Sequence, residues 1–189
     1  MIDYNNIVKY NRTQNELEEL IIFCICVAGK SAKTIAPRVH KLCGDPPTGF
    51  TPLEYLSWIE WNSPNAIRNR LQGLGVGCYS QKAKTILDLL NARLDLEKCP
   101  VSDLEKIKGI GPKTSRFFVM SSRRDVQHAA LDTHLLKFLA DSGVENVPKS
   151  TPSGKKYLTL EQTYLKMVPK GKTPAEWDLE IWKRYVNRR

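Results

Sequence analysis

The stretch "KIKGIGPKTSRFF", residues 106–118, decides the fold that this sequence predicts. A short helix over residues 102–107 leads into a tight turn at residues 108–111. A second helix starts at Pro112, because proline is tolerated at the first position of a helix. The sequence therefore predicts two helices joined by a glycine-rich hairpin, a helix-hairpin-helix.

The glycines of this hairpin favour a bound phosphate. Gly109 and Gly111 let the backbone turn sharply and come close to a ligand, while the second helix points unpaired N–H groups and its positive dipole end outward. Lys106 and Lys108 lie beside the turn and add positive charge. The alternative is a plain helix corner without a ligand, since glycine-rich corners are common.

Lys113 occupies the first turn of the second helix, where the helix dipole disfavours a cation. Stability alone does not explain a lysine there, whereas a reactive role does. A partly buried amine at a helix N-terminus is more easily deprotonated and can then attack a carbon atom, as Schiff-base lysines do. The alternative is a lysine that contacts phosphate or faces solvent.

Asp132 follows nineteen residues later, in "ALDTHLLKFL", residues 130–139. A helix of about three turns and a returning segment could bring Asp132 back beside Lys113. Its carboxylate could then stabilise positive charge on a sugar ring and help to deprotonate the lysine. Asp132 also suits the N-cap of a helix that begins at Thr133, and the two roles are compatible.

The rest of the chain predicts helices throughout. Strand-like alternation is nearly absent, and four Ser or Thr residues precede a glutamate at the spacing of a capping box, namely Thr13, Thr51, Ser102 and Thr173. We expect an all-α protein of about eight to ten short helices, in two helical lobes around a cleft, which would be a DNA-binding cleft if the family resemblance described below holds. One lobe would span residues 10–125 and contain the hairpin, and the other would combine residues 1–9 with residues 126–189.

The composition favours a nucleic-acid partner. The 189 residues include 29 Lys and Arg against 20 Asp and Glu, which gives a net charge of +9.

The longest apolar run, residues 20–28, is much shorter than the roughly 20 residues that cross a bilayer, and no signal-peptide pattern precedes it. The five cysteines form no C-x-x-C pair. We expect a cytoplasmic protein with no membrane partner, no metal and no cofactor.

Gly-Ile-Gly-x-Lys followed by Leu-Asp-Thr-His resembles the helix-hairpin-helix DNA glycosylase superfamily. The resemblance implies that Lys113 and Asp132 are the catalytic pair. The damaged base would be flipped out of the duplex, Lys113 would attack C1′ of the sugar as the base departs, and the Schiff base would cleave the strand by β-elimination. No cysteine follows Cys99, so the iron–sulfur loop of endonuclease III is not expected.

A more specific similarity is to the small archaeal-type, or type 2, 8-oxoguanine DNA glycosylase/AP lyase. It extends along nearly the whole chain and includes "GLGVGCYSQKA", residues 73–83, and "EWDLEIW", residues 176–182. It implies base-excision repair of 8-oxoguanine in double-stranded DNA by a bifunctional enzyme, which we expect to be a monomer. The alternatives are a glycosylase for another oxidised or modified base and a noncatalytic helix-hairpin-helix DNA-binding module.

The same similarity implies a base pocket. Trp182 would stack on the flipped base and Asp178 would line the same pocket, although Trp182 could instead be a core residue and Asp178 could serve the helix N-terminus. By its place after the first buried helix, the turn from Gly29 to Ser31 could face the DNA or the extrahelical base, or it could simply connect two helices. Cys78 stands where the family has an aromatic residue on the other side of the base. The sequence ends in Arg188-Arg189, where the family has a lysine that contributes to the base pocket.

Two further features each have two possible uses. Trp58 and Trp61 lie three apart on one side of a helix, and we expect core packing rather than a wedge that fills the gap left by a flipped base. Lys82 and Lys84 begin a helix and could contact phosphates, but solvent-facing side chains are the expected use.

Overall fold

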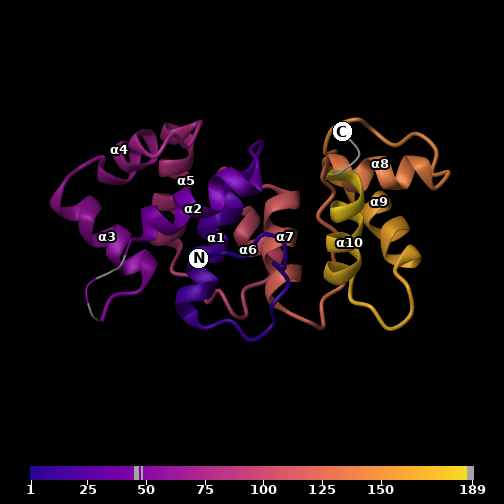
Figure 1. Ribbon diagram of the computed structural model, residues 1–189, viewed down its shortest axis with the longest axis horizontal. Helices are drawn as coiled ribbons and strands as arrows, with labels where there is room; N and C mark the ends of the chain where they lie inside the picture. The colour runs from indigo at the N-terminus through magenta and orange to yellow at the C-terminus, as the bar shows by residue number, and fades with distance from the viewer. Residues whose placement is uncertain (45–46, 48, 187–189) are drawn as a thin grey trace. The chain divides into compact units, whose positions relative to one another are not determined.

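The computed structural model describes residues 1–44, 47 and 49–186, and within them every regular element is an α-helix (Figure 1). The helices are α1 (Gln14–Val27), α2 (Ala32–Cys43), α3 (Pro52–Asn62), α4 (Ala66–Gly73), α5 (Tyr79–Ala92), α6 (Val101–Glu105), α7 (Pro112–Ser122), α8 (Thr133–Asp141), α9 (Gly154–Met167) and α10 (Pro174–Val186). The predicted all-α fold is confirmed. None of these described helices is long and apolar enough to cross a membrane.

The chain divides into two compact units. The first unit contains Met1–Tyr4 and Asn11–Gly111, and the second unit contains Asn5–Tyr10 and Pro112–Arg189. The expected lobes differ from this division in the place of Met1–Tyr4, which belong to the first unit, and in the place of α7. That helix packs against α10 and therefore belongs to the second unit.

Helix α1 forms the centre of the first unit. Residues 20–26 are all buried, which explains the apolar run in the sequence, and α1 packs against α2, α3 and α5. Lys82 of α5 is buried as well, and its Nζ donates a hydrogen bond of 2.6 Å to the carbonyl oxygen of Cys26. The expectation that Lys82 faces solvent or phosphate is therefore wrong, because its amine satisfies a carbonyl in the last turn of α1.

Helix α3 presents its tryptophans to solvent. Trp58 is 49% exposed and Trp61 is 88% exposed, while Leu56 and Ile59 fill the buried face of the same helix. The expected core packing of the two tryptophans is therefore wrong. Leu56 and Ile59 form the apolar face of α3, and the two tryptophans lie outside that face.

Capping boxes begin three of the four helices for which the sequence predicts them. The backbone N–H groups of Thr13, Thr51 and Thr173 donate to Glu16, Glu54 and Glu176 at 2.9, 2.8 and 2.8 Å. Ser102 is the exception, because α6 begins one residue earlier, at Val101, and Pro100 occupies the N-cap position. Each capping box satisfies N–H groups that the helix itself leaves unpaired.

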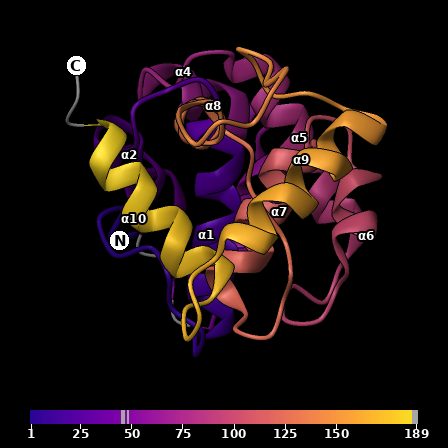
Figure 2. The ribbon, with the colours of Figure 1, turned by 90° about the vertical axis from the view of Figure 1, so that its right-hand side faces the viewer.

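The second unit contains α7, α8, α9 and α10 (Figure 2). Leucine, isoleucine and tyrosine side chains of α8, α9 and α10 form a core with Leu131, and α7 packs against α10. That core contains Leu131, Leu135, Leu136, Leu139, Tyr157, Leu160, Tyr164 and Ile181, each at most 2% exposed. The Tyr164 hydroxyl donates to the Pro174 carbonyl oxygen at 2.6 Å, which ties α9 to the start of α10. The core thereby holds α8 and α10, the helices that carry Asp132 at the N-cap and Asp178.

The turn of the hairpin is held by a buried threonine of α5. Gly109 has φ +101°, in the region that favours glycine, and the Thr85 hydroxyl donates to the Lys108 carbonyl oxygen at 2.9 Å. A methyl group added to Gly109 would collide with that hydroxyl. A methyl group added to Gly111 would meet no atom of the described residues.

Replacing the two hairpin glycines should therefore have different effects on stability. Gly109→Ala should lower the free energy of unfolding by roughly 2–4 kcal/mol, because it strains the backbone and displaces Thr85 from its hydrogen bond. Gly111→Ala should leave it unchanged or raise it by about 0.4–1 kcal/mol. Urea unfolding of both variants measures the difference, and equal losses would show that Thr85 does not hold the turn.

Candidate active site

Lys113 is the second residue of α7, directly after the proline that starts the helix. Its side chain is partly buried. Among the described residues its amine has no hydrogen-bond or ion-pair partner. The structure therefore holds a lysine amine in the first turn of a helix, and no described carboxylate forms an ion pair with it.

Asp132 is the N-cap of α8, as its sequence position predicts. Its Oδ1 accepts hydrogen bonds from the backbone N–H groups of His134 and Leu135, both at 2.8 Å. Its other oxygen, Oδ2, accepts no hydrogen bond from the described part of the chain. One oxygen thus anchors the carboxylate to the helix, and the other is available to a ligand.

Asp178 lies on α10, which packs against both α7 and α8. Burial raises the pKa of the Asp178 carboxyl well above its ordinary value. The charge of Asp132 raises this pKa further, and the charge of Lys113 opposes the rise. The three groups therefore lie close enough to influence one another, and the site favours the neutral form of the Asp178 carboxyl.

Trp182 follows Asp178 by one helical turn, so the two side chains share a face of α10. Trp182 is partly buried. The tryptophan of α10 that packs against the core of the second unit is Trp177, whose ring meets Phe138 edge-on at 5.9 Å between centroids. This arrangement leaves Trp182 available for stacking, and its place in a base pocket stays a prediction.

Gly29 and Cys78 belong to turns of the first unit. Both are exposed and both have positive φ, +69° for Gly29 and +58° for Cys78, which is the N-cap of α5. The two turns adjoin, because a methyl group added to Gly77 would lie 2.7 Å from Nζ of Lys30. The assignment of Gly29 and Cys78 to a base pocket stays a prediction, and the terminal Arg188-Arg189 lies outside the described residues.

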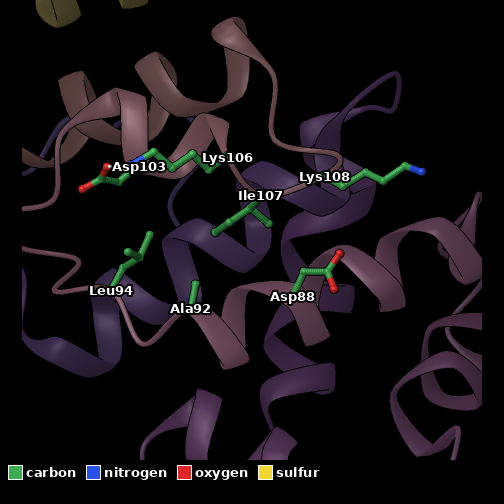
Figure 3. A pocket seen from close by; sticks show the side chains of 7 residues that line it. All are labelled: Asp88, Ala92, Leu94, Asp103, Lys106, Ile107 and Lys108. Atoms are coloured by element: carbon green, nitrogen blue, oxygen red, sulfur yellow. Dashed lines mark hydrogen bonds and ion pairs between the residues drawn. The ribbon is translucent and has the colours of Figure 1, made fainter.

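The side chains of the two hairpin lysines, Lys106 and Lys108, differ in their contacts (Figure 3). Nζ of Lys106 forms an ion pair of 2.8 Å with Asp103, whereas Lys108 extends away from that carboxylate without a partner among the described residues. Both line a surface hollow of about 470 Å³, together with Asp88, Ala92, Leu94, Asp103 and Ile107. That hollow contains none of the candidate catalytic residues.

The sequence did not single out a buried polar network next to Asp132. Glu161 is 4% exposed, and it forms an ion pair with Arg116 of 2.7 Å. The available signal was the position of Glu161 in α9, directly after Leu160 and one turn after Tyr157, on the apolar face of the helix. A glutamate on the apolar face of a helix predicts a buried group that forms an ion pair or hydrogen bonds with it.

Comparisons with known proteins identify the family. Residues 1–172 match the family Ogg-HhH, 8-oxoguanine DNA glycosylase, so α10 with Asp178 and Trp182 lies beyond the match. No curated protein matches the chain in sequence.

Three solved structures have a similar fold. The 8-oxoguanine DNA glycosylase of Thermotoga maritima is 25% identical, with a TM-score of 0.69 over 91% of this chain and 80% of that chain. The 8-oxoguanine glycosylase/lyase of Methanocaldococcus jannaschii, in complex with a 15mer DNA containing 8-oxoguanine, is 23% identical, with a TM-score of 0.67 over 94% and 84%. Another structure of the M. jannaschii glycosylase is also 23% identical, with a TM-score of 0.68 over 94% and 81%.

The family match covers most of the chain, and the solved glycosylases share its all-helical fold. The hairpin and the lysine that follows it lie within the matched residues. The chain therefore belongs to the 8-oxoguanine DNA glycosylase family.

Proposed function

We propose that this protein removes 8-oxoguanine from double-stranded DNA and then cleaves the strand through a Schiff base on Lys113. The observation that carries the proposal is the cluster of Lys113 at the start of α7, Asp132 at the start of α8 and Asp178 on α10, the helix that packs against both. Family membership supports the substrate. One structural neighbour is a glycosylase/lyase by name, which is consistent with the second activity.

The chemistry follows from the free groups of the cluster. The neutral amine of Lys113 attacks C1′ of the sugar, and the bond from C1′ to the base breaks as the base leaves with the electron pair. Ring opening converts the adduct to a protonated Schiff base, which makes a C2′ proton acidic. Loss of that proton expels the 3′ phosphate and cuts the strand by β-elimination.

Asp132 assists in two of these steps. Its free Oδ2 can accept a proton from the attacking amine, and its negative charge stabilises the positive charge that develops on the sugar ring. The hydrogen bonds of Oδ1 to the start of α8 keep the carboxylate from rotating away. A group fixed in this way loses little freedom when the substrate binds.

Asp178 and Trp182 would recognise the base. A neutral carboxyl donates a hydrogen bond, so Asp178 suits an acceptor atom on the base or on the departing anion. Stacking of the base on Trp182 would contribute about 1–3 kcal/mol. Both residues project from one face of α10, which allows them to act on the same base.

The hairpin would hold the DNA backbone. The first N–H groups of α7 have no partner within the helix and favour a phosphate, and Lys108 adds an unpaired positive charge. Lys106 contributes less to this contact, since its ammonium already pairs with Asp103. A purely DNA-binding hairpin would need these groups but has no use for Lys113, Asp132 and Asp178 together.

Cleavage of a duplex that carries 8-oxoguanine opposite cytosine tests the proposal. Lys113→Gln should lower the single-turnover rate of strand cleavage at least about 1000-fold, and Asp132→Asn should lower it about 100-fold or more. Asparagine caps helices as well as aspartate, so the second variant should keep its fold. Lys98→Gln, which changes an exposed lysine outside the cluster, is the control and should cleave at the normal rate.

The same assay separates the alternatives. Cleavage of a duplex with a different oxidised base but not of the 8-oxoguanine duplex would contradict the substrate assignment. Full activity of Lys113→Gln would contradict the Schiff base, and binding without cleavage of any damaged duplex would leave only the DNA-binding module.

The raised pKa of Asp178 predicts a pH-dependent gain in stability on mutation. The ordinary pKa is 3.8 and the folded value is higher, so the folded protein holds this proton more tightly than the unfolded chain does. Stability is therefore lost as the pH rises from about 4 through the folded pKa, because the unfolded chain releases the proton more easily. Asp178→Asn removes that loss. It should raise the melting temperature at pH 7–8, with a difference that shrinks towards pH 4.

Thermal unfolding at the two pH values measures this effect. Asp125→Asn, at an exposed carboxylate, is the matched control and should change the melting temperature little at either pH. A variant Asp178→Asn that is no more stable than the parent at pH 7–8 would show that the carboxyl is not destabilised by its surroundings.

A further inference from the structure

The backbone that leads into Asp132 has no regular secondary structure, and side chains hold it in place. The Tyr157 hydroxyl donates to the Ala129 carbonyl oxygen at 2.6 Å and accepts from the Leu131 N–H at 3.2 Å. The Thr151 hydroxyl donates to the Leu131 carbonyl oxygen at 2.8 Å. The peptide groups immediately before Asp132 are thus fixed by groups that are far away in the sequence.

Glu161 holds the same segment one helical turn further along α9. Its Oε1 accepts from the Ala129 N–H at 2.9 Å and from Nε of Arg116 at 2.7 Å, and Nδ1 of His128 lies 3.5 Å away. Burial alone would raise the pKa of Glu161, but these hydrogen bonds and the charge of Arg116 hold it below its ordinary value. The carboxylate therefore stays ionised and acts as the centre of the network.

Arg116 connects this network to the helix that carries the nucleophile. It lies on α7 three residues after Lys113, and its Nη1 is 3.4 Å from the Pro112 carbonyl oxygen. Its guanidinium group also lies over the Tyr157 ring, 4.8 Å from the centroid. A continuous set of contacts therefore runs from the first turn of α7, through Arg116 and Glu161, to the segment before Asp132.

Stability alone does not account for such a network. Replacing a buried ion pair by apolar side chains of similar volume is often neutral or stabilising, because both charges lose their hydration. Arg116 is 7% exposed and Glu161 is 4% exposed, so both charged groups have lost most of their hydration. The buried charges are better explained by the need to hold residues 128–131 in one position. Hydrogen bonds to a carboxylate have preferred directions and can do this, whereas an apolar contact would not.

We propose that Tyr157, Glu161 and Arg116 are positioning residues that set the placement of Asp132 relative to Lys113. This inference rests on the proposed function. Tyr157 and Glu161 hold the backbone before Asp132, and Arg116 ties that backbone to the helix of Lys113. None of the three needs to touch the DNA, and they act on the rate of chemistry rather than on substrate binding.

A double-mutant cycle between Tyr157 and Asp132 tests the inference. Tyr157→Phe removes the hydroxyl and keeps the ring on which Arg116 rests. We expect the single-turnover rate of cleavage on the 8-oxoguanine duplex to fall about 10- to 100-fold, with the dissociation constant for the duplex changed less than about 3-fold. In the Asp132→Asn background the same change should alter the rate less than about 3-fold, because Tyr157 acts through Asp132.

Tyr10→Phe is the matched control. It also removes a tyrosine hydroxyl of the second unit, one that lies 2.6 Å from Oγ1 of Thr173, and it leaves the segment before Asp132 untouched. Its cleavage rate should be that of the parent. Should Tyr157→Phe fail to fold, Glu161→Gln replaces it in the cycle, with the same expected loss of rate and the same loss of effect beside Asp132→Asn.

An equal rate loss in both Asp132 backgrounds would overturn the inference, because Tyr157 would then act independently of Asp132. A loss confined to duplex affinity would also overturn it. Full activity of Asp132→Asn alone is a different result, which contradicts the proposed function itself and the inference with it.

Discussion

The candidate site holds one amine and two carboxyl groups close together on three helices of the second unit. Lys113 begins α7, Asp132 caps α8 and Asp178 lies on α10. Burial and the charge of Asp132 both disfavour the ionised form of Asp178, so this arrangement lowers the stability of the folded chain. Such a cluster persists only where the surrounding structure fixes its members.

The surrounding structure fixes them in two ways. The apolar core of the second unit packs Leu135 and Leu136 of α8 and Ile181 of α10 together, which sets where those helices lie. The buried polar groups then set the direction of the backbone between the helices. Glu161 and Tyr157, one turn apart on α9, form hydrogen bonds with the backbone of Ala129 and Leu131, in the segment before Asp132. Packing thus brings the elements together, and hydrogen bonds determine their register.

The features that the sequence predicted are those with local physical causes. The hairpin glycines, the proline at the start of α7, three capping boxes and the N-cap at Asp132 can all be read within a few residues. The features that it did not predict depend on distant partners. Arg116 and Glu161 are 45 residues apart, and Lys82 reaches a carbonyl 56 residues away. Trp61 is expected in the core because tryptophan usually packs there, and it is nonetheless exposed, because Leu56 and Ile59 fill the buried face of α3.

The most direct test of the account is to trap the covalent intermediate. The protein is incubated with a duplex that carries 8-oxoguanine opposite cytosine in the presence of borohydride, which reduces a Schiff base to a stable amine, and the adduct is mapped by peptide mass spectrometry. The account predicts one adduct, attached to Nζ of Lys113. Release of 8-oxoguanine without any adduct, or an adduct on another amine of the chain, would contradict it.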